Sequence, residues 1–271
     1  MSNADQRSPW AGSAPGQPFV IEDDSVLTLH FDGAAVQSSM NPARPLDLLL
    51  DYSRIMMGAL LFVPSPRRIG MIGLGGGSLV KYCHHHLPQA HIAVAEISPE
   101  VIALRERFRI PPDDARLQID CADGAEWITR FDRHFDLLMV DGFDIGGQAG
   151  ALCTQRFYDD CHGALGDNGV LAINMHACDA LHGAYIGRVR TSFAGSVSVV
   201  ATADNVNEIV FAARGDCFRL SERQLRLRAG ALEQHLDLEL TWLARALTDG
   251  RRRAFAPPMR DTARYPLRSD E

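Results

Sequence analysis

The sequence has a single lysine, no Cys-x-x-Cys pair and no long hydrophobic run. The longest apolar run, Ile55 to Val63, is far shorter than the roughly 18 residues that a membrane helix needs. The six cysteines are widely spaced, so we expect free thiols rather than a disulfide framework or a zinc site. The first residues lack a basic segment followed by an apolar one, so we expect no signal peptide. These absences predict a cytoplasmic protein without a membrane span.

The balance of charges excludes a further class of partner. The chain has 27 basic and 34 acidic residues, which gives a formal net charge of −7. Such a surface argues against binding to the phosphate backbone, so we expect no nucleic-acid partner. The one lysine, Lys81, reflects an almost complete use of arginine, which we interpret as codon bias. The consecutive His84, His85 and His86 would point in different directions on a helix, so we expect no metal site there.

The composition changes along the chain and predicts four segments. Residues 1–18 are rich in Pro, Gly, Ser and Ala without periodicity, which is typical of a disordered leader. Residues 19–45 contain alternating apolar residues interrupted by Asp32-Gly33, which indicates a small β-hairpin cap. Residues 46–250 are expected to form the main domain, and residues 251–271 a polar tail.

Apolar strands alternate with helical segments through the main domain. We expect helices at 46–62, 78–87, 99–108, 157–165, 185–193 and 221–248, and a further helix that contains Trp127. We expect strands at 68–72, 91–96, 117–120, 135–140, 169–174, 197–201 and 207–212. This alternation predicts an α/β fold with a mostly parallel sheet, helices on both faces and one antiparallel strand near its edge.

Candidate binding residues follow four of these strands. They are the glycine loop from Gly73 to Gly77, then Glu96, Asp123 and Asp141. Because ligands of open parallel sheets bind beyond the carboxyl ends of the strands, we expect these residues on one edge. His176 follows a fifth strand, where we expect it at the rim.

The glycine loop and the first acid are consistent with a nucleoside site. Glu96 lies 23 residues beyond Gly73, and an acid at about this spacing can accept hydrogen bonds from ribose hydroxyls. Asp123 could accept from an adenine amine, or it could simply cap the helix that follows. The glycines could equally form plain turns, and Glu96 a solvated cap.

The order of glycine loop, Glu96, Asp123-Gly124 and Asp141-x-x-Asp144 resembles the spermidine synthase (polyamine aminopropyltransferase) family. The resemblance extends from about residue 27 to 213. It implies a Rossmann-like fold of the S-adenosylmethionine-dependent methyltransferases. It also implies an adenosyl sulfonium donor (decarboxylated S-adenosylmethionine or S-adenosylmethionine), a small-molecule amine acceptor, no metal and a possible homodimer.

The resemblance also assigns roles to individual residues. Asp141 corresponds to the catalytic proton acceptor. The acceptor amine would be bound by Gln37, Tyr52 and Asp144. The donor would be bound by Gly73, Gly75, Gly76, Gly77, Glu96, Ile97, Asp123 and Gly124. A carboxylate at position 141 could hold the acceptor ammonium and accept its proton while the nitrogen attacks the carbon beside the sulfonium.

Three positions depart from the family pattern. Gly76 stands where the family usually has an acid that contacts the donor's propylamine group. Ser53-Arg54 replaces a His-Glu pair, and Ile145 replaces a proline. Arg54 would repel a cationic acceptor unless it points elsewhere. The absence of an acid at Gly76 would also remove a repulsion against ordinary S-adenosylmethionine, which has a carboxylate.

The expected function is therefore aminopropyl transfer in polyamine biosynthesis, with two alternatives. One is a methyltransferase that uses the methyl carbon of the same sulfonium. The other is a nucleoside-binding module without catalysis.

Overall fold

The structure is a computed structural model that describes residues 17–255, except residues 24, 32–35 and 145–146. Most of the predicted leader, the Asp32-Gly33 turn, Ile145 and the tail beyond Phe255 lie outside the described residues.

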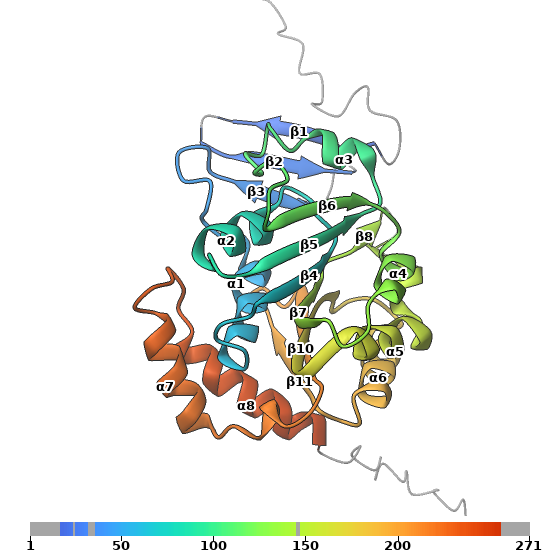
Figure 1. The fold of residues 1–271 in the computed structure, drawn as a ribbon, viewed down its shortest axis with the longest axis vertical. Coiled ribbons are helices and arrows are strands. Elements are labelled where there is room, and N and C mark those ends of the chain that lie inside the picture. Colours follow the sequence, from blue (N-terminus) through green and yellow to red (C-terminus); the bar gives the residue numbers. More distant parts are fainter. Residues whose placement is uncertain (1–16, 24, 32–35, 145–146, 256–271) are drawn as a thin grey trace, which may run out of the picture.

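A seven-stranded sheet forms the centre of the molecule (Figure 1), with the strand order β11-β12-β10-β7-β4-β5-β6. Its strands are β4 (Arg68–Ile72), β5 (His91–Glu96), β6 (Leu117–Cys121), β7 (Phe135–Val140), β10 (Leu165–His176), β11 (Val197–Ala201) and β12 (Asn207–Ala213). Neighbouring strands from β6 to β10 are parallel, whereas β12 is antiparallel to both β10 and β11. The predicted α/β fold and its antiparallel strand near the edge are confirmed.

The sheet is buried on both faces because its central strands are almost entirely apolar. Along β7, Leu137 and Met139 join one hydrophobic cluster, while Leu138 and Val140 join the other. This alternation follows from the two-residue period of a strand, which points successive side chains to opposite faces. Both clusters therefore pack against the same few strands and hold their carboxyl ends in fixed positions.

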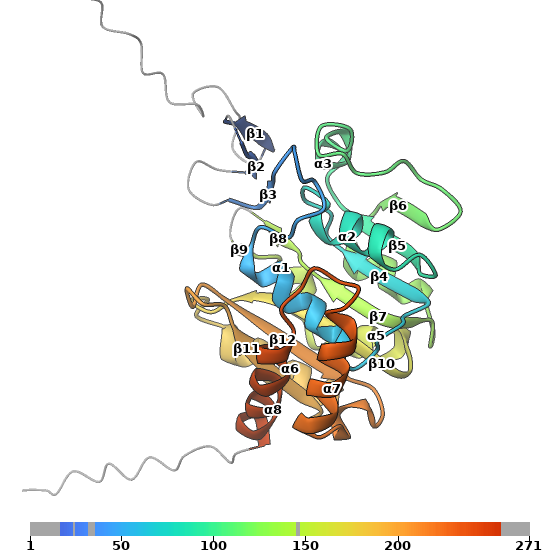
Figure 2. The same ribbon diagram turned by 90° about the vertical axis from the view of Figure 1, so that its left-hand side faces the viewer.

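Helices cover both faces (Figure 2). On one face lie α1 (Asp51–Met56), the 3₁₀ helix η1 (Met57–Leu61), α2 (Ser78–His86), α3 (Pro99–Ala103), α7 (Glu222–Leu232) and α8 (Thr241–Phe255). On the other lie α4 (Gly124–Trp127), η2 (Ile128–Arg130), η3 (Gly150–Cys153), α5 (Gln155–Ala164) and α6 (His182–Ser192). A further short 3₁₀ helix is η4 (Cys217–Arg219). None of the helices that the structure describes is long and apolar enough to cross a membrane.

The N-terminal strands form a separate antiparallel sheet in the order β1-β2-β3. Its strands are β1 (Phe19–Glu22), β2 (Leu27–His30) and β3 (Ser38–Met40). Leu29 and Met40 point into the same hydrophobic cluster as α2, which anchors the cap to the main sheet. A short hairpin of β8 (Phe143–Asp144) and β9 (Gly147–Gln148) directly follows β7 and lies toward the cap (Figure 2).

Several predicted helix boundaries are wrong. The helix expected over 46–62 begins only at Asp51, because Leu50 has an extended backbone, and it tightens into a 3₁₀ helix at Met57. Leu48 is buried without being helical, so its apolar character wrongly extended the predicted helix toward the N-terminus. The helix expected over 99–108 keeps α-helical geometry only to Ala103. The helical stretch expected over 221–248 is two helices: α7 ends at Leu232, and α8 begins at Thr241 and continues to Phe255.

Five of the six cysteines, Cys83, Cys121, Cys153, Cys161 and Cys178, are free thiols, as expected. Three of them are buried (Cys83, Cys153 and Cys161), whereas Cys121 and Cys178 are exposed.

The packing of α8 against β11 predicts a stability difference between two helical glycines. A Cβ at Gly250 would overlap the backbone oxygen of Val199 and lie 2.7 Å from Ser198 Oγ, whereas a Cβ at Gly230 on α7 meets nothing within 4 Å. Alanine favours a helix by up to about 1 kcal/mol over glycine, but overpacking costs about 1–3 kcal/mol. Gly250→Ala should therefore lower the free energy of unfolding in urea, and Gly230→Ala should not. Equal effects of the two substitutions would contradict this packing.

Candidate active site

A cavity of about 650 Å³ lies at the carboxyl ends of the parallel strands. Its wall combines the cap, the start of α1, the segments after β4, β5, β6, β7 and β10, and the turn between β11 and β12. This volume is within the range of small-molecule sites. Ten of the predicted site residues line it: Gln37, Tyr52, Gly73, Gly75, Glu96, Ile97, Asp123, Gly124, Asp141 and Asp144.

The other two predicted residues, Gly76 and Gly77, do not line this cavity. Both are buried behind the loop, where a Cβ at Gly76 would lie 2.5 Å from Ser38 Oγ and one at Gly77 would lie 2.5 Å from Ile110 side-chain carbons. They shape the turn from β4 into α2 rather than the wall that a ligand in this cavity would touch.

Gly73 brings the glycine loop against the end of β7. Its φ of +95° favours glycine, and a Cβ here would overlap the carbonyl oxygen of Asp141. The Asp141 N–H in turn donates to the Ile72 carbonyl at 2.9 Å. The loop and the candidate catalytic carboxylate are therefore held side by side by the backbone itself.

Glu96 is buried at the end of β5, with 8% of its surface exposed. One carboxylate oxygen accepts from Leu74 N at 2.8 Å and the other from Ser98 N at 2.9 Å. These bonds tie the second strand end to the glycine loop, and each oxygen keeps a further lone pair that can face the cavity. Glu96 is thus more than a solvated cap.

Asp123 caps α4, because its Oδ1 accepts from Ala125 N at 2.7 Å and from Glu126 N at 3.3 Å. It also lines the cavity, so the capping role and a ligand-binding role are compatible. Ile97 lines the same region with 66% of its surface exposed, an unusual position for a large apolar side chain. A flat apolar group in the cavity would cover it.

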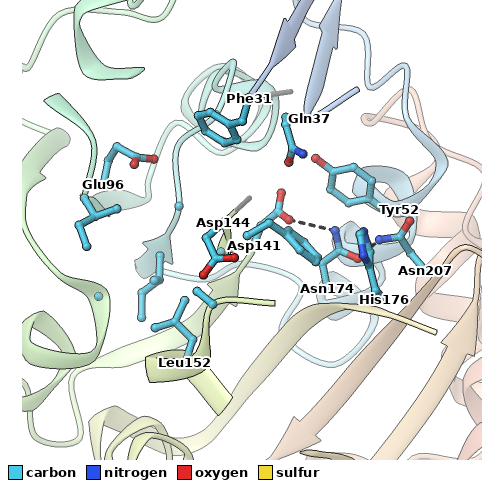
Figure 3. A pocket seen from close by; sticks show the side chains of 18 of the residues that line it. Phe31, Gln37, Tyr52, Glu96, Asp141, Asp144, Leu152, Asn174, His176 and Asn207 are labelled. Atoms are coloured by element: carbon cyan, nitrogen blue, oxygen red, sulfur yellow. Dashed lines mark hydrogen bonds between the residues drawn. The ribbon is translucent and has the colours of Figure 1, made fainter. Parts of the chain in front are cut away.

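Asp141 follows β7 and has two neutral donors beside it. Asn174 Nδ2 donates to its Oδ1 at 2.9 Å, which Figure 3 marks with a dashed line. The Tyr52 hydroxyl also hydrogen-bonds to the carboxylate. Burial raises the pKa of Asp141 above its usual range, and the two hydrogen bonds only partly offset this. The pKa of Tyr52 is raised well above its ordinary value by burial and by the Asp141 charge, so its hydroxyl stays protonated.

Asn174 is a site residue that the sequence reasoning missed. It is 2% exposed, two residues before β10 ends at His176, and its Oδ1 accepts from Asn207 Nδ2 at 2.8 Å. Gln148 Nε2 donates to the Asn174 backbone oxygen at 3.1 Å, which ties the β8–β9 hairpin to the same strand. These contacts fix which end of the Asn174 amide faces Asp141. The rule that singled out the ends of the other strands would have found it.

Further polar side chains line the cavity around Asp141. Gln37 and Tyr52 point toward Asp141 from the cap side, and Asp144 lies beside it (Figure 3). His176, expected at the rim, lines the cavity and packs on Phe143 with ring centroids 4.5 Å apart. Burial lowers the pKa of His176 below its usual value.

Arg54 points away from this cavity. Its guanidinium donates to the Leu48 carbonyl at 2.7 Å and lies 3.4 Å from Asp51 Oδ1, facing a separate surface depression. None of the described residues that line the main cavity is Lys or Arg. Because the Arg54 guanidinium is directed away from the cavity, it does not repel a cation bound there.

No group of three His, Cys, Asp or Glu residues in the described part of the chain could hold a metal ion.

Known structures share this architecture. A probable spermidine synthase from Corynebacterium glutamicum superimposes with a TM-score of 0.68 at 19% identity, covering 86% of this chain and 91% of that one. Human methyltransferase-like protein 13, solved in complex with SAH, gives a TM-score of 0.64 at 24% identity, covering 69% of this chain and 93% of that one. At such identities the likeness defines the fold class, that of S-adenosylmethionine-dependent methyltransferases.

Sequence comparison narrows the class to a family. Residues 50–204 match the spermine/spermidine synthase domain. A protein of Chromobacterium violaceum named polyamine aminopropyltransferase is 37% identical, over 81% of this chain and 85% of its own length. The chain belongs to the spermine/spermidine synthase family, a family of transferases.

The Asn174 contact predicts a change in the pKa of Asp141. Asn174→Ala removes a donor to the carboxylate and should raise this pKa, and Asn174→Asp should raise it further because it adds a like charge. Carbon-13 NMR titration of the aspartate carboxyls measures this, with Asp141→Asn used to assign the signal. An Asp141 signal that titrates at the same pH in all three proteins would contradict the contact.

Proposed function

We propose that this protein transfers an aminopropyl group from decarboxylated S-adenosylmethionine to a small-molecule amine in polyamine biosynthesis. The observation that carries the proposal is the position of Asp141: a partly buried carboxylate with a raised pKa, in a cavity whose charged lining residues are all acidic. The printed name of the Chromobacterium violaceum relative supports the same activity.

The donor and the acceptor occupy different parts of the cavity in this proposal. Glu96 and Asp123 bind the nucleoside by accepting hydrogen bonds from its ribose and adenine, and Ile97 packs on the adenine. Gly73 and Gly75 let the chain between nucleoside and sulfonium pass close to the backbone. This arrangement would place the carbon beside the sulfonium next to Asp141.

Gln37, Tyr52 and Asp144 would hold the acceptor amine on the other side of Asp141. An amine enters as an ammonium ion and has no lone pair until it loses a proton. The Asp141 carboxylate, which Asn174 contacts at Oδ1, would hold the ammonium and accept its proton. The nitrogen then attacks the carbon, the carbon–sulfur bond breaks, and methylthioadenosine leaves as a neutral thioether.

The raised pKa of Asp141 suits this role. A proton acceptor works best when its pKa approaches the working pH, because it then gains the proton without holding it too tightly. The sign of the pH dependence follows: transfer should be lost as the pH falls through the raised pKa of Asp141, where the carboxylate becomes protonated before it meets the amine.

Substitution of the carboxylate tests the proposal. Asp141→Asn keeps the shape of the side chain and should lower methylthioadenosine release by about 10²–10⁴-fold, while calorimetry should find donor affinity within about three-fold of the original. Asp216→Asn serves as a control, since Asp216 is exposed and pairs with the surface residue Arg219. Unchanged release in Asp141→Asn would remove Asp141 from the mechanism.

The products of the same assay distinguish the alternatives. Release of adenosylhomocysteine from S-adenosylmethionine would identify a methyltransferase. Donor binding without turnover across a panel of mono-, di- and triamines would identify a nucleoside-binding module.

A further inference from the structure

A narrow niche extends from the main cavity toward α2. It has a volume of about 30 Å³ and shares Gln37, Tyr52, Gly73 and Asp141, among other residues, with the main cavity. Its own lining includes Ser38 of β3 and the first turn of α2, Ser78, Leu79 and Val80. The niche therefore starts beside the candidate catalytic carboxylate and ends at a helix N-terminus.

The α2 N-terminus offers unpaired donors. The helix has nine residues, its N-cap is Gly77, and no side chain caps it. The first backbone N–H that donates within the helix is that of Lys81, to the Gly77 oxygen at 2.8 Å. The N–H groups of residues 78–80 have no acceptor among the described residues, and the first turn holds no acid. Such a terminus favours an anion.

Ser38 provides an independent sign of a missing ligand. Only 4% of its surface is exposed, it lines the niche, and its hydroxyl has no hydrogen-bond partner among the described residues. The hydroxyl lies against the loop, where a Cβ at Gly76 would come within 2.5 Å of it. A ligand oxygen in the niche would accept a hydrogen bond from this hydroxyl.

The charges around the niche favour an anion at its inner end. Asp141 is the one carboxylate among its lining residues and stands at the outer end, shared with the main cavity. One turn along α2, the buried ammonium of Lys81 lies 3.0 Å from Met40 Sδ, two residues beyond Ser38 on β3. It also donates to the Phe108 carbonyl at 2.8 Å.

Gly76 cannot supply an acid here. A Cβ at this position would lie 2.8 Å from the Phe108 ring as well as against Ser38. The loop therefore keeps a negative side chain out of the niche by its packing.

We propose that the niche binds a carboxylate at the end of the donor chain, so that the protein also uses S-adenosylmethionine itself and transfers a 3-amino-3-carboxypropyl group. This inference rests on the proposed function, since it uses the same cavity and the same base. The unpaired N–H groups of α2 and the hydroxyls of Ser38 and Ser78 bind the carboxylate.

The chemical step is that of aminopropyl transfer with a different chain. The acceptor nitrogen forms a bond to the chain carbon attached to sulfur, and that carbon–sulfur bond breaks with its electron pair going to sulfur. Neutral methylthioadenosine leaves, and the proton of the acceptor passes to Asp141. The product is an amine whose new substituent ends in an amino acid group.

Calorimetric titration with each donor tests the binding part. The proposal predicts that S-adenosylmethionine binds within about ten-fold of the decarboxylated donor. A preference of roughly a hundred-fold or more for the decarboxylated donor would overturn it.

Mass spectrometry of the products tests the transfer part. With S-adenosylmethionine and an amine, we expect methylthioadenosine and a product that is heavier than the aminopropyl product by one CO₂. Adenosylhomocysteine in place of methylthioadenosine would overturn the transfer, because the methyl group would then be the one that moves.

A substitution in the first turn of α2 tests the position of the carboxylate. Ser78→Asp suits a helix N-terminus, so the chain should fold, but its charge occupies the niche. The ratio of S-adenosylmethionine affinity to decarboxylated-donor affinity should fall by roughly ten-fold or more, since like charges at contact distance repel strongly. Ser78→Asn adds the same bulk without charge and should change the ratio far less. Equal ratios in the two variants would overturn the assignment.

The failures of the two proposals can be told apart. No methylthioadenosine with either donor would refute aminopropyl transfer. Release with the decarboxylated donor alone, together with weak binding of S-adenosylmethionine, would refute only the carboxylate niche.

Discussion

The hydrogen bond from Asn174 to Asp141 is the interaction on which the site depends. A hydrogen bond to a charged group contributes about 1.5–3 kcal/mol. The bond from Asn174 therefore lowers the cost of burying the Asp141 carboxylate at the end of an apolar strand, but it does not cancel that cost. Asp141 therefore stays able to ionise while its pKa remains raised. The bond also orients the carboxylate in the cavity. Every other proposed contact is arranged around this carboxylate.

The sheet brings the remaining groups to this carboxylate. Because β4, β5, β6, β7 and β10 are parallel, their carboxyl ends meet at one edge, and Glu96, Asp123, Asp141 and Asn174 arrive there from separate strands. The Gly73 backbone fits against the Asp141 carbonyl, and Glu96 ties the glycine loop to the next strand. The loop and the proposed base are thus positioned by the same contacts that hold the strands together.

Much of this edge could be predicted from the sequence, because buried parallel strands are continuous apolar runs and their ends are marked by glycine or acid. The residue at which α1 begins could not be predicted, because Leu48 is apolar and buried without being helical. Asn174 carries no charge and has no sequence signal beyond its place at a strand end. The niche depends on tertiary packing of Ser38 against Gly76, between segments far apart in the chain, and no local pattern indicates it.

A crystal structure with methylthioadenosine bound tests the central claim most directly. The account predicts the adenine beside Asp123 and Ile97, the ribose hydroxyls on Glu96, and the sulfur facing the carboxylate of Asp141. A nucleoside bound elsewhere, or one whose sulfur points away from Asp141, would contradict it.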